Sequence, residues 1–405
     1  MKILMILADR DFPPDIRVEK EIRSLRIAGH KTTIICSKFG QDTNVEYWDT
    51  TQIIRVPKAT GLNRKISTAR RILTFNDQYW SSHIENTITS IKPEILHVHD
   101  LPMLGTAINI GKRHNLPVIA DFHENYPAAL EYYRKQEKRH GSLIQDFYFS
   151  PKRWQAYEKR CAMLSNHIIV VVKEARERII QLGITADKIT TIENTVDIRY
   201  FESLELDHEL INKYKDRFVI SYIGGFGGWH RGLDTAIMAL PKIKNNIPNA
   251  LLLLVGDGNI KENLLEMVTT LSLQNYVNFI PWQPFDKVPS YISLSHVCII
   301  PHHSNPHTDS TSPHKLFQYM LMNKPIVTSD CKPLKRIINE TQSGLVFTAG
   351  NHLELAEQII ILKDSSLRKR LGEAGKKAVL SHYNWEETSK KLYTVYEQFL
   401  PNQFI

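Results

Sequence analysis

The sequence has few cysteines and no long apolar run. These two features argue against a disulfide-rich protein and against a membrane-spanning one. Its 405 residues include four cysteines, which lie far apart and form no Cys-x-x-Cys pair. No apolar run approaches the roughly 18 residues that a membrane-spanning helix requires. The sequence therefore predicts reduced thiols and a chain that does not cross a bilayer.

The first residues do not resemble a secretory signal. Residues 1–8 hold one charge and a short apolar stretch, which leads into Asp9-Arg10-Asp11 without a small-residue cleavage site. This pattern is typical of a first buried strand. Together with the reduced thiols it predicts a cytoplasmic protein.

Acidic residues are scarce in two stretches of the first half, which carries most of the net charge of +8. Residues 55–71 hold six basic residues and no acidic ones, and residues 134–160 mix basic residues with aromatic ones. Such stretches suit an anionic membrane surface or nucleic acid. A solvated basic face is the plainer alternative.

Apolar runs and amphipathic segments alternate along the whole chain, as in βαβ units on a parallel sheet. Helices are expected over 16–29 and 102–114. The strands expected in the first half are 3–7, 32–36, 52–56, 95–98, 118–121 and 167–172. The alternation then restarts, with strands expected at 218–223, 251–255, 277–280, 297–301, 325–328 and 344–347.

This pattern predicts an α/β protein of two doubly wound, Rossmann-like domains, 1–200 and 201–384, joined near residues 198–216. A last amphipathic helix, near 385–405, is expected to pack back on the first domain. Ligands of open α/β sheets bind beyond the carboxyl ends of the strands. We therefore expect a site in a cleft between the two domains.

The strongest local motif is the loop after the strand at 218–223. Gly224, Gly225, Gly227 and Gly228 precede Arg231 and the start of a helix. Backbone N–H groups, a helix N-terminus and a guanidinium together suit a diphosphate. A nicotinamide dinucleotide site is the alternative, but the glycines match no GxGxxG register.

Two more strand ends in the second half carry polar groups. Gly256-Asp257-Gly258 follows the strand at 251–255 and would line a nucleotide base. The polar loop 310–314 leads into a helix whose first turn carries Lys315, so an ammonium and backbone donors would face the same side. A surface lysine on an ordinary helix is the alternative.

In the first half, histidines stand beside acids at two strand ends. His99-Asp100 follows the strand at 95–98, and His123-Glu124 follows the strand at 118–121. At these places a histidine could bind a sugar hydroxyl or shuttle a proton. A histidine with a structural hydrogen bond is the alternative, more so for His99 than for His123.

Metal ligation is a further alternative for these histidines, and for the group His302, His303 and His307. No ligand-type spacing supports it. Asp9-Arg10-Asp11 copies the DxD motif of metal-dependent transferases, but it follows the first strand rather than a nucleotide-binding core. We interpret that match as chance and predict no metal site.

Taken in order, these segments resemble glycosyltransferase family 4, the retaining group of GT-B fold, over essentially the whole chain. The resemblance implies two facing Rossmann-like domains, and transfer of a hexose-type sugar from a nucleoside diphosphate sugar with retention of configuration. The matching segments are 12–21, 29–30, 99–101, 121–124, 194–197, 224–232, 256–258 and 315–330.

The resemblance also implies roles for single residues. It places His123 beside the transferred sugar, and Arg231 and Lys315 at the diphosphate, which makes these three the candidate catalytic residues. The donor-binding residues it implies are Gly224, Gly225, Gly227, Arg231, Gly256, Asp257, Ser310, Lys315, Leu316 and Gln318. The residues it implies on the acceptor side are Arg17, His99, Asp100, Glu124 and Asn194.

Three positions depart from the family pattern. Ser310 and Gln318 stand where the two glutamates of E-x7-E are usual, and Gly225 replaces a basic residue. Gln318 can still bridge two ribose hydroxyls, whereas Ser310 lacks the carboxylate that meets the hexose. A GT-B binding subunit without transfer activity is therefore the alternative function, and a sugar-nucleotide epimerase is a third.

No metal or other cofactor is implied, because fixed cations would stabilise the departing diphosphate and the UDP- or GDP-linked sugar is a co-substrate. The expected acceptor is a surface glycan or a lipid-linked molecule. The basic first domain would meet it as a peripheral protein at the inner face of the cell membrane, and no nucleic acid is expected as a partner.

Overall fold

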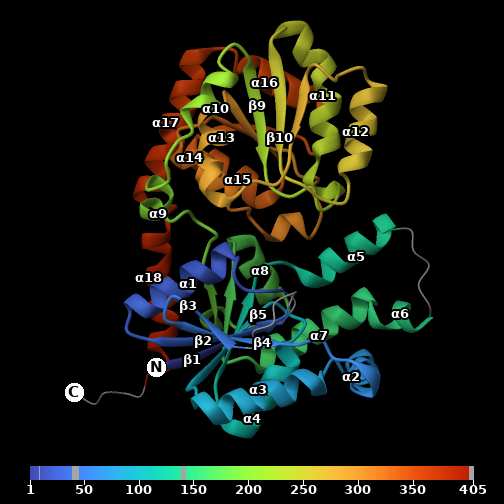
Figure 1. Ribbon diagram of the computed structural model, residues 1–405, viewed down its shortest axis with the longest axis vertical. Helices are drawn as coiled ribbons and strands as arrows, with labels where there is room; N and C mark the ends of the chain where they lie inside the picture. Colours follow the sequence, from blue (N-terminus) through green and yellow to red (C-terminus); the bar gives the residue numbers. More distant parts are fainter. Residues whose placement is uncertain (9, 39–44, 138–142, 401–405) are drawn as a thin grey trace. The chain divides into compact units, whose positions relative to one another are not determined.

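The computed structural model describes residues 1–8, 10–38, 45–137 and 143–400 (Figure 1). The chain divides into two compact units: unit 1 holds Met1–Glu193 and the residues from Ser389 on, and unit 2 holds Asn194–Thr388. The boundary therefore falls a few residues before the expected position near 200. No helix among the described residues meets the length and hydropathy that a membrane span requires.

Unit 1 is built on an eight-stranded sheet in the order β3-β4-β2-β1-β5-β6-β7-β8. Neighbouring strands are parallel, except that β3 runs antiparallel to β4. The strands are β1 (Lys2–Leu7), β2 (Lys31–Ser37), β3 (Val45–Trp48), β4 (Thr51–Val56), β5 (Ile95–His99), β6 (Val118–Phe122), β7 (His167–Val170) and β8 (Ile189–Thr191).

All six strands expected in this half are confirmed, and two short edge strands were missed. β1 is fully buried from Ile3 to Leu7, as expected for a strand inside a parallel sheet. β3 mixes charged and aromatic residues, and β8 is three residues long, so neither gives a clear apolar run. The sequence pattern therefore finds the centre of this sheet better than its edges.

The helices of unit 1 connect these strands. α1 begins after Asp15, whose carboxylate accepts hydrogen bonds from the backbone N–H groups of Arg17 and Val18. The helices are α1 (Ile16–Ile27), α2 (Gly61–Thr74), α3 (Gln78–Ile91), α4 (Leu104–His114), α5 (Tyr126–Glu137), α6 (Leu143–Tyr148), α7 (Pro151–Leu164) and α8 (Lys173–Gln181). The last helix, α18 (Trp385–Glu397), starts among residues of unit 2 and ends in unit 1.

Unit 2 is built on a six-stranded parallel sheet in the order β11-β10-β9-β12-β13-β14, and each of its strands was expected. The strands are β9 (Phe218–Ile223), β10 (Ala250–Val255), β11 (Val277–Ile280), β12 (Val297–Ile300), β13 (Ile326–Ser329) and β14 (Gly344–Phe347). The α-helices are α9 (Ile198–Glu202), α10 (His208–Lys213), α11 (Leu233–Asn246), α12 (Lys261–Thr270), α13 (Val288–Ser293), α14 (Lys315–Leu321), α15 (Lys332–Thr341), α16 (His352–Ile361) and α17 (Ser365–Ser381).

The loop between β9 and α11 is held tightly against its neighbours. The N–H of Gly224 donates to the carbonyl of Val255 at 2.8 Å. Gly232 has a φ of 65°, and a Cβ there would collide with the carbonyl oxygen of Pro301. Gly227 lies in open space, since a Cβ there would meet nothing within 4 Å. Protein packing thus requires glycine at Gly232 but not at Gly227.

Gly232→Ala is expected to lower the free energy of unfolding by about 2–4 kcal/mol, because it combines left-handed backbone strain with a collision. Gly227→Ala, in the same loop, should change it by less than about 1 kcal/mol. Urea denaturation of both variants measures the difference. Equal effects would contradict the packing described for this loop.

Candidate functional site

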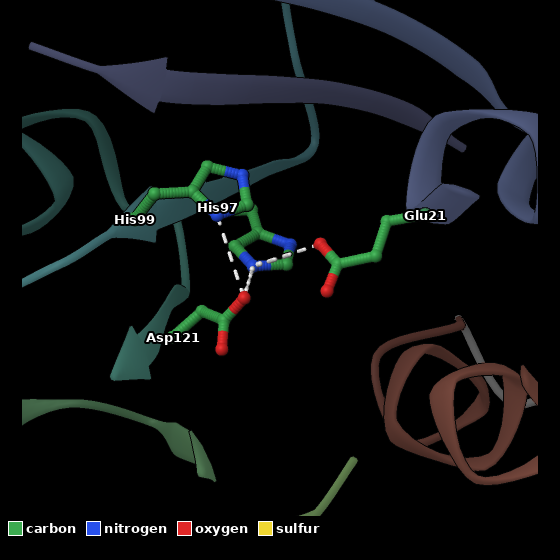
Figure 2. Close-up of side chains that lie close together, drawn as sticks. All are labelled: Glu21, His97, His99 and Asp121. Atoms are coloured by element: carbon green, nitrogen blue, oxygen red, sulfur yellow. Dashed lines mark ion pairs between the residues drawn. The ribbon is translucent and has the colours of Figure 1, made fainter. Parts of the chain in front are cut away.

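A buried cluster of polar side chains lies at the carboxyl ends of β5 and β6 in unit 1. The register of these strands pairs His97 with Ile119 and His99 with Asp121. α1 adds Glu21, and the side chains of Glu21, His97, His99 and Asp121 point toward one another (Figure 2). All four residues are at most 3% exposed. We call these four residues the buried cluster.

Arg17 of α1 provides the positive charge of this cluster. Its Nη2 lies 2.9 Å from Oδ1 of Asp121, and its Nε lies 3.1 Å both from Oδ2 of Asp121 and from Oε1 of Glu21. Nη1 donates to the carbonyl of Ile192 at 2.9 Å. Arg17 is 2% exposed, so the structure places it within the protein's own network rather than on a surface where it could meet an acceptor.

The spacing of the buried cluster bears on metal binding. Each of its four members offers one ligand atom, and these atoms lie within 4.8 Å of one another. Arg17 lies beside both carboxylates and binds Asp121 through two hydrogen bonds, so a cation here would compete with a bidentate guanidinium. Asp9, part of the DxD match, lies outside the described residues.

His123 contacts the buried cluster from the end of β6, with its side chain 13% exposed. Its Nε2 lies 3.1 Å from Oδ2 of Asp121 and 3.2 Å from Nδ1 of His99. Its Nδ1 lies 3.6 Å from Oδ2 of Asp100, and its backbone N–H donates to Oδ1 of Asp100 at 3.1 Å. Both ring nitrogens of His123 therefore face acceptors.

These contacts set the charges of the two histidines in opposite directions. Burial lowers the pKa of His123, but the carboxylates of Asp100 and Asp121 outweigh it and raise that pKa to about 9. Burial, with nearby His97, lowers the pKa of His99 to about 3. At neutral pH, His123 is a cation that donates hydrogen bonds, and His99 is a neutral acceptor. A cationic His123 can donate a hydrogen bond or a proton but cannot take up a further proton, and both expected roles, binding a sugar hydroxyl and shuttling a proton, remain predictions.

In unit 2, two cations stand at the glycine loop, by which we mean residues 224–232. Nζ of Lys315 lies 3.4 Å from the centre of the Tyr222 ring, and a Cβ on Gly224 would collide with that ammonium. Nε of Arg231 is buried without a hydrogen-bond partner. Within the described part of the chain, neither Arg231 nor Lys315 forms an ion pair with an acid.

The charges of this pair are uncompensated. Burial, and then repulsion by Arg231, lowers the pKa of Lys315 well below its ordinary value. Such a lysine gains its full charge when an anion arrives, because the anion favours the protonated form. The loop, the two basic side chains and the start of α11 are thus the kinds of group that bind anions, and we predict an anion site here.

The other residues expected to bind the donor differ in burial and in hydrogen-bond partners. The hydroxyl of Ser310 donates to the carbonyl of Pro306 at 2.8 Å, and Gln318 is 7% exposed. The side chain of Leu316 is fully buried in the core, so only its backbone could meet a ligand. Asp257 lies at the surface, where its carboxylate accepts from the N–H of Gly258 at 2.8 Å and pairs with Lys261.

Of the alternative metal group His302, His303 and His307, two members lie near Arg231, together with His230, which was not expected there. His230, His302 and His307 are each at most 5% exposed, and the ring of His230 lies 6.4 Å from that of His302 and 5.4 Å from that of His307. Burial, followed by Arg231, lowers the pKa of all three, so they are neutral. His303 instead pairs with Asp234 at 3.0 Å.

Asn194 and Glu124, both expected on the acceptor side, lie in different units. Nδ2 of Asn194 donates to the carbonyl of Ser312 at 3.2 Å, and both residues belong to unit 2. Glu124 is half-buried beside His123 in unit 1. The structure thus groups Asn194 with the loop that precedes Lys315, and Glu124 with the buried cluster.

The sequence analysis missed three residues of unit 1: Glu21, His97 and Tyr396. Oη of Tyr396 lies 2.6 Å from Nδ1 of His97, across 299 positions of sequence. Glu21 falls on the buried face of α1, where a carboxylate was not expected. The one available signal was the pattern His97-x-His99, because residues two apart in a strand lie on the same face.

This chain has two doubly wound sheets, and a glycine loop with two cations follows the first strand of the second sheet. This is the architecture of the GT-B class of glycosyltransferases. Sucrose-phosphate synthase of Thermosynechococcus elongatus has the same fold, with a TM-score of 0.79 and 17% identity over 98% of both chains. HepE of Anabaena, solved with UDP-glucose, has a TM-score of 0.73 and 15% identity over 98% of this chain and all of that one.

The family follows from the sequence comparisons. Residues 17–200 match the family described as Glycosyltransferase Family 4, and residues 205–378 match the one described as Glycosyl transferases group 1. The uncharacterised glycosyltransferase MJ1069 of Methanocaldococcus jannaschii is 22% identical over 258 residues, which cover 62% of this chain and 64% of that protein. The chain belongs to glycosyltransferase family 4.

The raised pKa of His123 predicts how its contribution to stability varies with pH. A histidine whose pKa is raised from about 6.5 to about 9 stabilises the fold fully below about pH 6.5, and this contribution is lost as the pH rises through about 9. His123→Gln should therefore lower the free energy of unfolding by about 1–3 kcal/mol more near pH 6 than near pH 10. Urea denaturation at both pH values measures this.

The matched control is His208→Gln, because His208 is exposed at the start of α10. It should cost little at either pH. If His123→Gln cost the same at both pH values, His123 would not carry the bound proton that its contacts indicate.

Proposed function

We propose that the protein transfers a hexose-type sugar from a nucleoside diphosphate sugar to a hydroxyl of a surface glycan or lipid-linked acceptor, with retention of anomeric configuration. The observation that carries this proposal is the pair Arg231 and Lys315, two cations without an acidic partner among the described residues, beside the glycine loop. A diphosphate supplies the missing negative charge. That HepE of Anabaena was solved with UDP-glucose supports a donor of this class.

In this proposal the cations promote departure of the nucleoside diphosphate. When the bond between the anomeric carbon and the phosphate oxygen breaks, negative charge develops on that oxygen. Arg231, Lys315 and the loop amides are already oriented toward an anion, so little reorganisation is needed. Fixed cations would then fill the role that a divalent metal has in other transferases, and no metal would be required.

The side chains of unit 1 suit a hydrogen-bonding role toward the sugar. His123 is a cation at neutral pH, and since its N–H groups face Asp100, Asp121 and His99, a sugar hydroxyl would share one of them. Asp121, the nearest carboxylate, is held by Arg17 and His123 and is buried, which makes it unsuitable as a covalent nucleophile. The acceptor hydroxyl would instead attack on the face from which the diphosphate leaves, and a diphosphate oxygen would take its proton.

A panel of UDP, GDP, CDP, ADP and NAD, each with and without magnesium, tests the donor site by thermal shift. One diphosphate at about 100 times its dissociation constant should add roughly 2.7 kcal/mol of stability, with or without magnesium. Arg231→Ala and Lys315→Ala should abolish this shift. Lys335→Ala, at an exposed lysine of the same unit, should leave it intact.

The outcomes of this panel separate the competing functions. A response to NAD alone would overturn the proposed donor. Binding of a diphosphate without any acceptor-dependent release of nucleotide would favour the binding subunit that Ser310 and Gln318 suggested. Conversion of the sugar nucleotide without an acceptor would favour an epimerase.

A surface of α2 and α6 supports the membrane part of the proposal. These helices pack together, although they come from the two basic stretches of the sequence. Arg153 joins them: its Nη2 donates to the carbonyl of Ile72 at 2.9 Å, and its guanidinium lies 3.8 Å from the centre of the Phe147 ring. Leu143, Ile144 and Phe147 of α6 are 89%, 61% and 47% exposed.

Exposed apolar side chains beside basic ones are the combination that binds an anionic membrane surface. The basic residues on α2 are Arg64, Lys65, Arg70 and Arg71. Residues 138–142, within the second basic stretch, lie outside the described residues. We therefore place the proposed membrane contact at α2 and α6.

Flotation with liposomes tests this contact. The protein should float with vesicles that contain phosphatidylglycerol and not with pure phosphatidylcholine. Replacing Leu143 and Ile144 together by glutamate should weaken flotation at least about tenfold, because apolar area is lost and repulsion is added. Leu353→Glu, at a leucine 52% exposed on α16, is the control. Equal flotation with both lipids would contradict the membrane contact.

A further inference from the structure

The C-terminal helix reaches the buried cluster through one side chain. Tyr396 of α18 is fully buried, and its Oη lies 2.6 Å from Nδ1 of His97. Burial raises the pKa of Tyr396 well above its ordinary value, so the phenol keeps its proton and can donate it. We assign the phenol as the donor, with His97 accepting at Nδ1 and its Nε2–H on the side of Asp121 and Glu21.

This tautomer suits the other side of the His97 ring. Nε2 of His97 lies 3.5 Å from Oδ2 of Asp121 and 3.9 Å from Oε2 of Glu21. A protonated Nε2 is attracted to both carboxylates, whereas a bare nitrogen there would be repelled. The hydrogen bond from Tyr396 thus selects the form of His97 that the buried cluster requires.

From His97 the contacts continue to His123. The rings of His97 and His99 are stacked, with centres 4.5 Å apart and planes 22° apart. Nδ1 of His99 lies 3.2 Å from Nε2 of His123, and both nitrogens lie within 3.4 Å of the same oxygen of Asp121. The stacked His97 ring therefore helps to hold His99 where its Nδ1 can accept a hydrogen bond from His123.

We propose that Tyr396 is a positioning residue for His123, acting through the hydrogen bond to His97 and the stacked ring of His99. Tyr396 touches no reacting group itself. It fixes the His97 ring, which holds His99 as an acceptor beside His123. This inference rests on the proposed function, since a positioned His123 affects turnover only if His123 contacts the transferred sugar.

Other groups also face His123 and are left unchanged by a substitution at Tyr396. Asp15, Arg17 and Glu21 approach from α1 and its N-cap, Asp100 follows β5, and Asp121 lies on β6. Removing the Tyr396 hydroxyl frees His97 and loosens His99, so His123 loses one acceptor and keeps its two carboxylates. The titration midpoint of His123 should then fall, and should stay above the ordinary value.

The test is Tyr396→Phe in the full chain, with histidines labelled with ¹³C and titrated by NMR. The resonance of His123 is identified by its loss in His123→Gln. In Tyr396→Phe its midpoint should fall by roughly half a unit or more. Tyr393→Phe is the control, because Tyr393 lies on the same helix one turn earlier and is only half-buried. It should leave the midpoint unchanged.

Turnover provides a second readout once a donor is known. Tyr396→Phe should lower kcat about tenfold, which corresponds to about 1.4 kcal/mol, and leave KM for the donor unchanged. The alkaline limb of its pH-rate profile should shift to lower pH together with the NMR midpoint. His97→Asn removes the ring that Tyr396 contacts and that stacks on His99. Combining it with Tyr396→Phe should therefore add little to the fall in kcat or to the shift of the pH-rate profile.

The NMR measurement needs no substrate, so it separates this inference from the proposed function. An unchanged His123 midpoint in both Tyr396→Phe and His97→Asn would overturn the positioning role. If Tyr396→Phe does not fold, His97→Asn alone decides in the same way. A shifted midpoint in a protein that transfers no sugar would uphold the coupling and contradict the proposed function instead.

Discussion

The buried carboxylate of Asp121 is the constraint on which the polar architecture of unit 1 depends. A charge with no exposed surface is stable only with partners, and Arg17 supplies two hydrogen bonds to it. This pairing fixes α1 against the end of β6, and α1 brings Glu21 with it. The remaining acceptor capacity of Asp121 draws in His97, His99 and His123. His123 is a cation because Asp100 and Asp121 together outweigh its burial, whereas for His99, 3.2 Å away, burial and nearby His97 outweigh the attraction of Asp121.

The charged side chains at the two sites differ in whether they are paired with an opposite charge. In unit 1 the charge of Asp121 is met by Arg17 and by His123 within the same unit. In unit 2, Arg231 and Lys315 have no acid beside them among the described residues. Without an anion, burial and repulsion by Arg231 lower the pKa of Lys315, and a bound anion would restore its charge. The proposed donor diphosphate would therefore supply the negative charge that the protein does not place beside Arg231 and Lys315.

The sequence predicted most of the fold, because long apolar strands and strand-end glycines are local signals. It also singled out His123, directly after β6, Arg231 in the glycine loop after β9, and Lys315 at the start of α14, and their roles remain predictions. It could not predict Tyr396, whose contact with His97 joins distant parts of the chain, or Glu21, whose burial is explained only by Arg17 and the histidines. Nor could it predict that Arg17 is enclosed, or that His123 is protonated, since a pKa depends on every charge nearby. Composition and periodicity are enough to predict helices and strands. The charge state of a side chain depends on tertiary contacts that only the folded structure shows.

The anomeric configuration of the product tests the central claim most directly. Asp100 and Asp121 are both engaged in ion pairs with His123, and the proposed diphosphate would receive the acceptor's proton on the leaving-group face. An α-linked donor should therefore give an α-linked product, visible as the anomeric proton coupling in the ¹H NMR spectrum of the isolated glycoside. A β-linked product would show inversion and would contradict same-face attack, even if the diphosphate binds as described.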